Sequence, residues 1–305
     1  MVQMSDGEDE PKTSGFTIGW WNSHLTPPKG NKLPDLEKAL VLATIEAMLS
    51  TINIFFLGEV DQEDMDWLDK NIGRSNLTSQ FFQRHDGKAN YNLGVIYRND
   101  LAFFDEPIFK TAGVGGKNYK LAVQIDALIC DALEVRFFLS HWPSRLMLVD
   151  EAPNRLLIGQ SLRQEVDESL GRGCNNIILL GDYNEEPYNQ SMRSFLRATR
   201  DAAHVSRKRE LLYNPFWKHI ACPNGYSRDG ELPSPTGTYF YAADDIHKWL
   251  TFDQMLFSHG FVGGSDWHLV DKSVTVYRDP TLVSAVESGR FKVDHLPIIA
   301  AIVKD

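Results

Sequence analysis

Short apolar runs alternate with polar, turn-forming segments along most of the chain. The runs are rich in Val, Ile and Phe and are bounded by Gly, Pro, Asn or Asp, which is typical of β-strands. Several runs are almost continuously apolar, as expected for strands that are buried on both faces. We predict strands at residues 16–21, 53–59, 93–98, 121–130, 134–142, 176–183, 252–258 and 296–303.

Helical patterns lie between some of these strands. Residues 34–50 carry apolar side chains at helix spacing after Pro34. Residues 154–173 end in glycines, as a helix stop does, and residues 188–202 form a third candidate helix. Because helices occur between strands in both halves, the pattern favours a layered α/β or α+β domain with sheets inside and helices outside.

The chain has 305 residues, of which 43% are hydrophobic and 24% charged, and this is an ordinary globular composition. Residues 1–15 are acidic and lack an apolar segment, so we predict a disordered leader there and a single domain over residues 16–305. Residues 203–238 are the least regular stretch and mix aromatic with basic residues. This composition is typical of a binding loop.

Charge, hydropathy and cysteine content narrow the functional classes. The net charge of -10 argues against broad, charge-driven affinity for nucleic acid, although a local basic groove and a metal ion are compatible with it. No apolar run approaches the roughly 20 residues of a membrane helix, so we expect no membrane partner. The three cysteines are far apart and form no CxxC pair. This favours a reducing compartment, and we predict a cytoplasmic location.

Several predicted strands end at a polar residue of the metal-binding or catalytic type. Each residue alone is typical of a turn. Together, carboxylate and amide oxygens suit Mg²⁺ or Mn²⁺, and two histidines suit proton transfer or phosphate contact. The set comprises Asn22, Glu59, His141, Asp182, Asn184, Asp253, Asp294 and His295. His24 follows Asn22 closely but has no partner at metal-ligand spacing.

The order of these motifs resembles the endonuclease/exonuclease/phosphatase superfamily, whose members are similar to deoxyribonuclease I. The motifs WWN, GE, SHW, GDYN, FDQ and VDH occur in family order between residue 16 and about residue 303. GDYN alone has little specificity, whereas six motifs in order are specific. The motifs HWPSR and GDYNEEPYN are most similar to a bacterial-type nuclease subgroup. The resemblance implies a four-layer α/β sandwich, in which two packed mixed β-sheets are flanked by helices.

The resemblance also implies hydrolysis of a phosphodiester by water with the help of Mg²⁺ or Mn²⁺. It makes Glu59 the first metal ligand, with Asn22 nearby and Asp294 as a further or water-mediated ligand. The number of metal ions, one or two, stays open.

The remaining residues of the set receive catalytic roles from the resemblance. Asp182 and Asn184 would orient the water and a phosphate oxygen, and Asp182 is one candidate base. Asp253 would hold the ring of His295, which would donate to the phosphate or accept a proton. His141 would be a phosphate ligand or general acid. The division between acid and base stays open.

Basic residues close to these motifs are candidates for substrate contact. A guanidinium pairs well with phosphate oxygens, so Arg145 and Arg155 are predicted to bind phosphate, and the alternative is a salt bridge that holds the loop. Arg193 and Arg197 recur at helix spacing after GDYNEEPYN. They mark either a phosphate track or a solvated helix face.

These observations predict a metal-dependent nuclease that acts on DNA. The alternative is a phosphoesterase for a small or lipid phosphate, of the inositol phosphatase or sphingomyelinase type. Inositol phosphatases usually carry an arginine after GDxN and another after the late Asp, where Glu185 and Gln254 stand in this chain. A third hypothesis is a non-catalytic effector of the same fold, or one that a protein partner activates.

Overall fold

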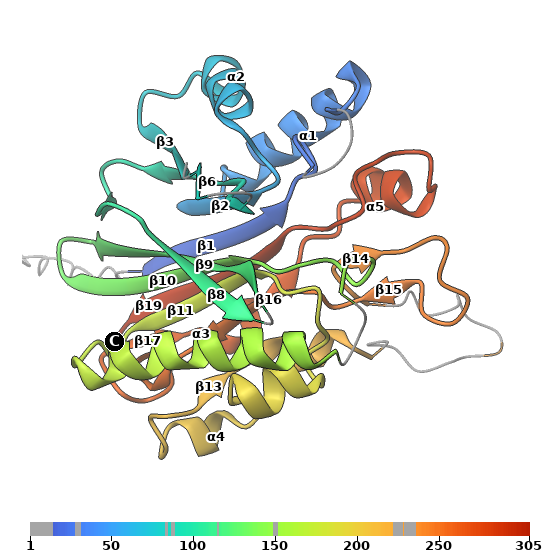
Figure 1. Ribbon diagram of the computed structural model, residues 1–305. Helices are drawn as coiled ribbons and strands as arrows, with labels where there is room; N and C mark the ends of the chain where they lie inside the picture. The colour runs from blue at the N-terminus through green and yellow to red at the C-terminus, as the bar shows by residue number, and fades with distance from the viewer. Residues whose placement is uncertain are drawn as a thin grey trace, which may run out of the picture.

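The computed structural model describes residues 15–27, 32–82, 85–86, 89–114, 116–148, 152–221, 228 and 236–305. The leader predicted over residues 1–15 therefore lies outside the described residues except for its last position, and part of the irregular stretch 203–238 lies outside them too. In the described chain, two large β-sheets form the centre of the molecule (Figure 1).

The first large sheet has seven strands in the described residues and contains both ends of the domain. Its order is β17-β19-β1-β2-β6-β3, with β18 also pairing with β19. The sheet is mixed, because β1 runs parallel to β2 and antiparallel to β19. Its strands are β1 (Gly15–Asn22), β2 (Ile54–Gly58), β3 (Leu77–Phe82), β6 (Leu93–Arg98), β17 (Trp267–Leu269), β18 (Thr275–Val276) and β19 (Ile298–Lys304).

The second large sheet has eight strands in the described residues and is also mixed. Its order is β12-β13-β16-β11-β10-β9-β7, with β8 also pairing with β9. Its strands are β7 (Ala102–Phe104), β8 (Ile108–Val114), β9 (Lys117–Ile129), β10 (Leu133–His141), β11 (Ile177–Asp182), β12 (Ala198–Thr199), β13 (Leu212–Tyr213) and β16 (Asp253–Phe257). Two small hairpins add β4 (His85–Asp86) with β5 (Ala89–Asn90), and β14 (Tyr239–Phe240) with β15 (Trp249–Leu250).

Helices cover the outer faces of the two sheets. In Figure 1, α1 and α2 lie beyond the first sheet, while α3 and α4 lie beyond the second. The helices are α1 (Asp35–Met48), α2 (Gln62–Ile72), α3 (Pro153–Gly171), α4 (Ala202–Val205) and α5 (Pro280–Glu287), with short π or 3₁₀ turns η1 (Ser191–Phe195), η2 (Pro215–His219), η3 (His259–Phe261) and η4 (Asp271–Ser273). The predicted architecture of two packed mixed sheets flanked by helices is therefore confirmed.

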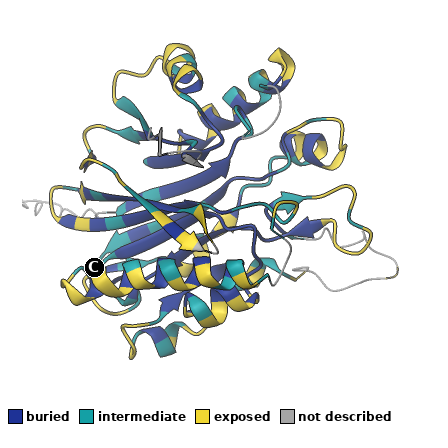
Figure 2. Cartoon of the chain, in the orientation of Figure 1, coloured by how far each residue is buried: buried dark blue, intermediate teal, exposed yellow. Residues whose placement is uncertain are grey.

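The main apolar core fills the space between the two sheets, where the strands are buried (Figure 2). Phe56 of β2 meets Phe137 of β10 across this space, with ring centroids 5.1 Å apart. A second core lies under α3, where Leu162 packs with Phe138 and Leu179. Neighbouring residues of β10 thus face different cores, which explains why Phe137, Phe138 and Leu139 follow one another without a polar residue between them.

Two helix expectations need correction. The helix expected over 188–202 is only the five-residue turn η1, because Arg197 takes a left-handed φ of 59° and the chain then enters β12. The sequence reasoning also missed α2, although Asp61 and Asp64 form a capping box at its start. Among the described residues, no helix is long and apolar enough to cross a membrane.

Candidate active site

Four strand ends meet at one edge of the sandwich. β1 ends at Asn22 beside Gly58 of β2, so that Glu59 follows directly. In the other sheet, β10 ends at His141 beside Asp182, the last residue of β11. Because both pairs are parallel, the carboxyl ends of the paired strands lie together. A hydrogen bond of 3.2 Å from Asn22 Nδ2 to Asp182 Oδ2 links the two sheets at this edge.

Gly181 allows β11 to approach β10 closely just before Asp182. Its φ is 148°, and a Cβ atom placed there would lie 1.9 Å from the carbonyl oxygen of Ser140. A side chain at this position would therefore push the two strands apart. The glycine of the GDYN motif thus sets the spacing between His141 and Asp182.

The predicted histidines and carboxylates converge between these strand ends. His141 Nε2 lies 3.6 Å from Glu59 Oε1 and 3.9 Å from Asp182 Oδ2. His295 Nε2 approaches the same Asp182 oxygen at 3.8 Å and Asp294 Oδ1 at 3.9 Å. Residues that are more than 200 positions apart in sequence therefore surround one small volume.

Asp253 fixes the ring of His295. Its Oδ2 lies 2.7 Å from His295 Nδ1, and its Oδ1 accepts a 2.7 Å hydrogen bond from Trp20 Nε1. Asp253 is fully buried, so both bonds are shielded from water. With a proton on Nδ1 pointing at Asp253, the other ring nitrogen is directed toward Asp182.

Asn184 lies at the same edge, and its hydrogen bonds hold the loop that follows β11. Its backbone N–H donates to Asp182 Oδ1 at 2.8 Å, and its Nδ2 donates to the carbonyl oxygen of Trp142 at 3.1 Å. These bonds hold the carboxylate of Asp182 and connect the ends of β10 and β11.

Three residues of this edge have left-handed backbones, with φ of 59° at His24, 57° at Glu59 and 51° at Asn184. For residues other than glycine this conformation costs on the order of 1–3 kcal/mol each, and it persists only where neighbours enforce it. At Glu59 one such contact is present, because the carbonyl oxygen of Glu59 accepts a 2.6 Å hydrogen bond from Thr26 N. Such residues concentrate at functional sites, which supports a site here.

Burial and neighbouring charges give the titratable groups different protonation states. Burial lowers the pKa of His295, but the ion pair and hydrogen bond with Asp253 outweigh it and raise the pKa to about 10. Burial raises the pKa of Asp182 to about 7, against the attraction of His295. Burial, followed by the charge of Lys120, holds the pKa of His141 well below its ordinary value. The edge therefore combines a charged imidazole, a neutral imidazole and a carboxylate that titrates near neutrality.

The chemistry of the edge fits a divalent cation. Asn22 Oδ1, Glu59 Oε2 and Asp294 Oδ1 are buried and accept no hydrogen bond from the described residues. Buried oxygens without a donor are costly, and a hard cation removes that cost. In the described chain, no three His, Cys, Asp or Glu side chains already form a complete metal-binding arrangement. The fit rests instead on two carboxylates and an amide, with water and phosphate completing the shell as Mg²⁺ usually requires.

Residues 31–296, most of the chain, match the endonuclease/exonuclease/phosphatase family. The chain belongs to this family. Members of the endonuclease/exonuclease/phosphatase family are phosphoesterase hydrolases. A comparison with curated proteins gave no significant match. The bacterial-type subgroup stays a prediction.

Solved structures of the endonuclease/exonuclease/phosphatase fold match almost the whole chain. The human nocturnin catalytic domain with bound sulfate has 16% identity and a TM-score of 0.60, covering 96% of this chain and 98% of that one. The Bacteroides thetaiotaomicron mannosyl-6-phosphatase has 18% identity and a TM-score of 0.56, with coverages of 94% and 99%. D. rerio TDP2 complexed with a single-strand DNA product has 13% identity and a TM-score of 0.59, with coverages of 95% and 99%. At these identities the likeness shows the fold alone.

The predicted arginines fall into different environments within this family member. Arg145 lies at the candidate active site, where Nε donates to Asn184 O at 3.1 Å and Nη2 to Asn189 Oδ1 at 3.0 Å. Arg193 and Arg197 are exposed, and no hydrogen bond or ion pair in the described chain joins either to the central histidines or carboxylates. They do not share a helix face, because the expected helix is absent. Arg145 therefore contacts the loop after β11 that carries Asn184, and its contact with phosphate stays a prediction.

Arg155 holds the loop instead of facing the site. It is only 1% exposed, its Nη1 pairs with Glu185 Oε1 at 3.3 Å, and Nε and Nη2 donate to the carbonyl oxygens of Leu148 and Pro143. The predicted phosphate contact of Arg155 therefore gives way to the alternative role, a salt bridge that holds the loop.

We expect Arg155→Met to lower the free energy of unfolding by about 3–5 kcal/mol, because the change leaves the carboxylate of Glu185 buried without its partner. Denaturant unfolding would measure it. Arg172→Met is the matched control, since Arg172 is 76% exposed and pairs with a surface glutamate, a type of ion pair that contributes about 0–1 kcal/mol. Equal, small losses in both variants would contradict the structural role of Arg155.

The two positions that separated nucleases from inositol phosphatases in sequence are both buried. Glu185 is 1% exposed and pairs with Arg155, and Gln254 is fully buried. Gln254 Nε2 donates to the carbonyl oxygen of Glu185 at 2.5 Å, so the two residues connect β16 to the loop after β11. Both residues therefore have a structural role in this chain, and the argument from the missing arginines stays a prediction.

The sequence did not mark Trp20, Tyr239 and Lys120 as residues at or beside the site, and it placed His24 near Asn22 without assigning it a role. Trp20 lies two residues before Asn22 on the same strand face, a spacing that could have identified it. His24 lies 3.2 Å from Glu59. Tyr239 and Lys120 lie on strands without a polar end motif, so no sequence signal marked them. The ring of Tyr239 is 4.7 Å from that of His295, and Lys120 lines a small pocket with His141. Burial lowers the pKa of Lys120 to about 8, although Glu59 and Asp182 oppose the shift.

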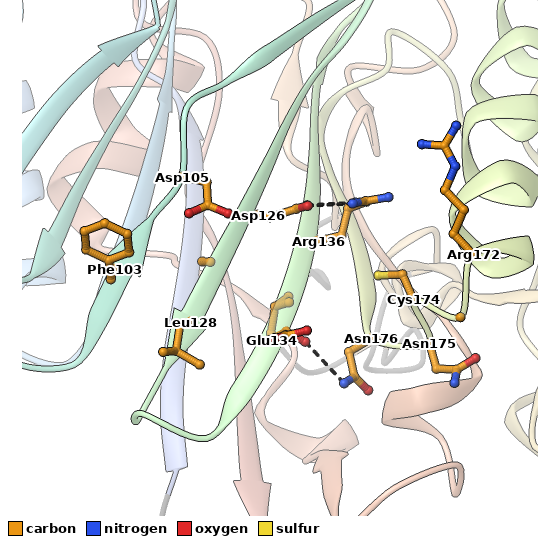
Figure 3. A pocket seen from close by; sticks show the side chains of 13 residues that line it. Phe103, Asp105, Asp126, Leu128, Glu134, Arg136, Arg172, Cys174, Asn175 and Asn176 are labelled. Carbon is orange, nitrogen blue, oxygen red and sulfur yellow. Dashed lines mark hydrogen bonds and ion pairs between the residues drawn. The ribbon is translucent and has the colours of Figure 1, made fainter.

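A second hollow lies at the other end of β10 and β11, away from the candidate active site (Figure 3). This cavity of about 650 Å³ is lined by apolar residues such as Phe103 and Leu128 and by polar side chains, several of which form hydrogen bonds. Arg136 Nε binds Asp126 Oδ1 at 2.7 Å, and Asn176 Nδ2 donates to the carbonyl oxygen of Glu134 at 3.2 Å. These contacts stabilise the strand ends and offer no chemistry for phosphate hydrolysis.

Proposed function

We propose that the chain is a divalent-metal-dependent phosphodiesterase that cleaves nucleic acid, with DNA as the expected substrate. The observation that carries the proposal is the convergence of Glu59, Asp182, His141 and the His295–Asp253 pair at one edge of the sandwich. This arrangement supplies an oxygen site for a cation, a carboxylate that titrates near neutrality and a charged imidazole.

Asn22, Glu59 and Asp294 would hold the divalent ion, which when bound offsets the negative charge of the phosphate and of the leaving oxygen. Asp182 is our candidate base for the attacking water, because a group with a pKa of about 7 accepts a proton effectively at neutral pH. His295 carries a positive charge and donates from Nε2 to a phosphate oxygen or to the leaving oxygen.

Two further residues complete the proposed mechanism. His141 remains neutral and donates one hydrogen bond to the phosphate without adding charge. Arg145 binds a non-bridging oxygen from the rim. Each role is that of a donor or acceptor held in position by the fold before the substrate reacts.

A row of aromatic rings beside His295 supports nucleic acid as the substrate. The ring of Tyr239 stacks on Phe252 at 5.2 Å and on Tyr241 at 6.3 Å, each at 14°. Tyr241 is 36% exposed, and the Arg145 guanidinium lies 4.6 Å from the centroid of the Phe252 ring. Aromatic faces next to a phosphate-binding residue can stack on nucleobases, which a small sugar phosphate lacks.

We expect the purified protein to nick supercoiled plasmid with Mn²⁺ or Mg²⁺ and to lose this activity in EDTA. Parallel assays would use linear DNA, single strands, RNA, a sugar phosphate and a sphingolipid phosphodiester.

Tyr241→Ala is expected to raise the KM for DNA by about tenfold, since stacking one base contributes about 1–3 kcal/mol. The effect should disappear on an oligonucleotide that is abasic next to the cleaved bond.

Ile246→Ala is the control, because Ile246 is 82% exposed in the same β14–β15 hairpin and carries no ring. Release of phosphate from the sugar phosphate without strand cleavage would overturn the proposal in favour of the small-substrate alternative. Absence of hydrolysis in every assay would favour the effector that needs a protein partner.

A further inference from the structure

His24 lies between two of the oxygens assigned to the metal. Its Nδ1 is 3.2 Å from Glu59 Oε2 and 3.6 Å from Asp294 Oδ1. Both oxygens are buried and form no hydrogen bond of good geometry within the described residues, but each pairs with His24 when its ring is protonated. One ring nitrogen thus faces two buried carboxylate oxygens, with which it forms an ion pair when the ring is protonated.

We propose that Nδ1 of His24 is a nitrogen ligand of the divalent ion that Glu59 and Asp294 bind. This inference rests on the metal site of the proposed function. Adjacent ligands of an octahedral ion with bonds of about 2.1 Å lie about 3 Å apart, close to the two distances observed. The arrangement is not yet a complete site. The side chain of Asp294 is 33% exposed, so its carboxylate has room to turn toward an ion held by Glu59 and His24.

The backbone directs His24 to this position. Its φ of 59° is in the left-handed region, which is uncommon for residues other than glycine, although histidine adopts it more often than most. The flanking residues are tied to the end of β2, because Ser23 N donates to Gly58 O at 3.0 Å and Thr26 N donates to Glu59 O at 2.6 Å. The loop that carries the imidazole is therefore connected to the strand that carries the first carboxylate ligand.

A nitrogen ligand changes which metal the site prefers. Mg²⁺ favours an all-oxygen shell, and an imidazole nitrogen suits the later transition-metal ions best. Mn²⁺ shares the oxygen preference of Mg²⁺, but as a transition-metal ion it accepts a nitrogen ligand more readily than Mg²⁺ does. The sequence left Mg²⁺ and Mn²⁺ as alternatives, and a ligand at His24 favours Mn²⁺. The competing role for His24 is that of a protonated counter-ion, which would pair with the two carboxylates and leave when the metal binds.

Pulsed EPR of the Mn²⁺-loaded protein tests the inference without any assay of activity. We expect ¹⁴N coupling to a directly bound imidazole in the wild type and its loss in His24→Asn. Asparagine accepts a left-handed backbone and offers an oxygen in place of the nitrogen. His247→Asn is the control, because His247 is exposed in the β14–β15 hairpin, and its coupling should match the wild type. Absence of coupling in the wild type, or its survival in His24→Asn, would overturn the inference.

Calorimetric titration provides the second measurement. His24→Asn is expected to weaken Mn²⁺ binding by about tenfold or more and to change Mg²⁺ binding by less than about threefold. Equal changes for both ions would indicate a counter-ion and not a ligand. These results are independent of the substrate: a protein that shows the coupling but cleaves no phosphodiester would refute the proposed function and leave the ligand assignment intact.

Discussion

Replacing Glu59 with Gln is expected to reduce metal-stimulated phosphodiester hydrolysis by about 10³-fold, because the cation contributes several kcal/mol to stabilising the transition state. The same variant should lose the rise in melting temperature that Mn²⁺ gives the wild type, since a ligand stabilises only the form that binds it. Glu59 Oε2 forms no hydrogen bond of good geometry within the described residues, and what Gln at this position loses there is the ion pair with a protonated His24.

Stability in EDTA separates this prediction from simple damage to the fold. Burial raises the pKa of Glu59, which means that its negative charge opposes folding when no cation is present. Glu59→Gln should therefore melt at the wild-type temperature or above it in EDTA. Glu46→Gln, on the exposed face of α1, is the matched control and should leave both activity and metal response unchanged. An active Glu59→Gln, or one that metal still stabilises, would remove Glu59 from the metal site.

Replacing Asp253 with Asn is expected to lower kcat by about 10³–10⁴-fold with little change in KM, which is the behaviour of a His–Asp pair whose carboxylate sets the tautomer of the ring. The amide would still accept from Trp20 through its oxygen, so its nitrogen would face His295 Nδ1. His295 would then carry its proton on Nε2 and lose the carboxylate that sustains its positive charge.

NMR titration of the imidazole signals gives an independent measurement of this effect. The pKa of His295, about 10 in the intact pair, should fall in Asp253→Asn because the opposite charge is gone. Asp266→Asn, an exposed substitution, serves as the control and should alter neither kcat nor the titration. An unchanged kcat with a lowered pKa would show that the charge of His295 plays no part in the chemistry.

The parts of this molecule that the sequence predicts are those with a local signal. Strands such as β11 are short apolar runs with a glycine or a carboxylate at the end, and this pattern depends only on neighbouring residues. The ends of β1, β2, β10 and β11 meet because their strands are parallel and paired. Asn22, Glu59, His141 and Asp182 could therefore be grouped from sequence, given the family order of their motifs.

What the sequence did not predict depends on contacts between distant segments. In the sequence Arg155 resembles a phosphate-binding residue. In the structure Glu185, 30 positions away, lies beside it in the interior. Residues 188–202 have helical spacing, but pairing of β12 with β13 ends the helix early. In the sequence Trp20 is typical of a core residue, and only the fold places its indole N–H against Asp253. Contacts between residues that are distant in sequence decide these cases, and such contacts cannot be inferred from a single sequence.

The left-handed backbones at His24, Glu59 and Asn184 have a consequence for anyone who engineers this scaffold. Glycine adopts such a backbone without strain, so a screen for heat resistance alone would favour glycine at these positions if the gain outweighs the lost contacts. Each such replacement would remove a polar group from the edge where the strands meet. Thermal stability and catalytic activity therefore favour different residues at these three positions. Directed evolution of this protein has to select for both properties at once.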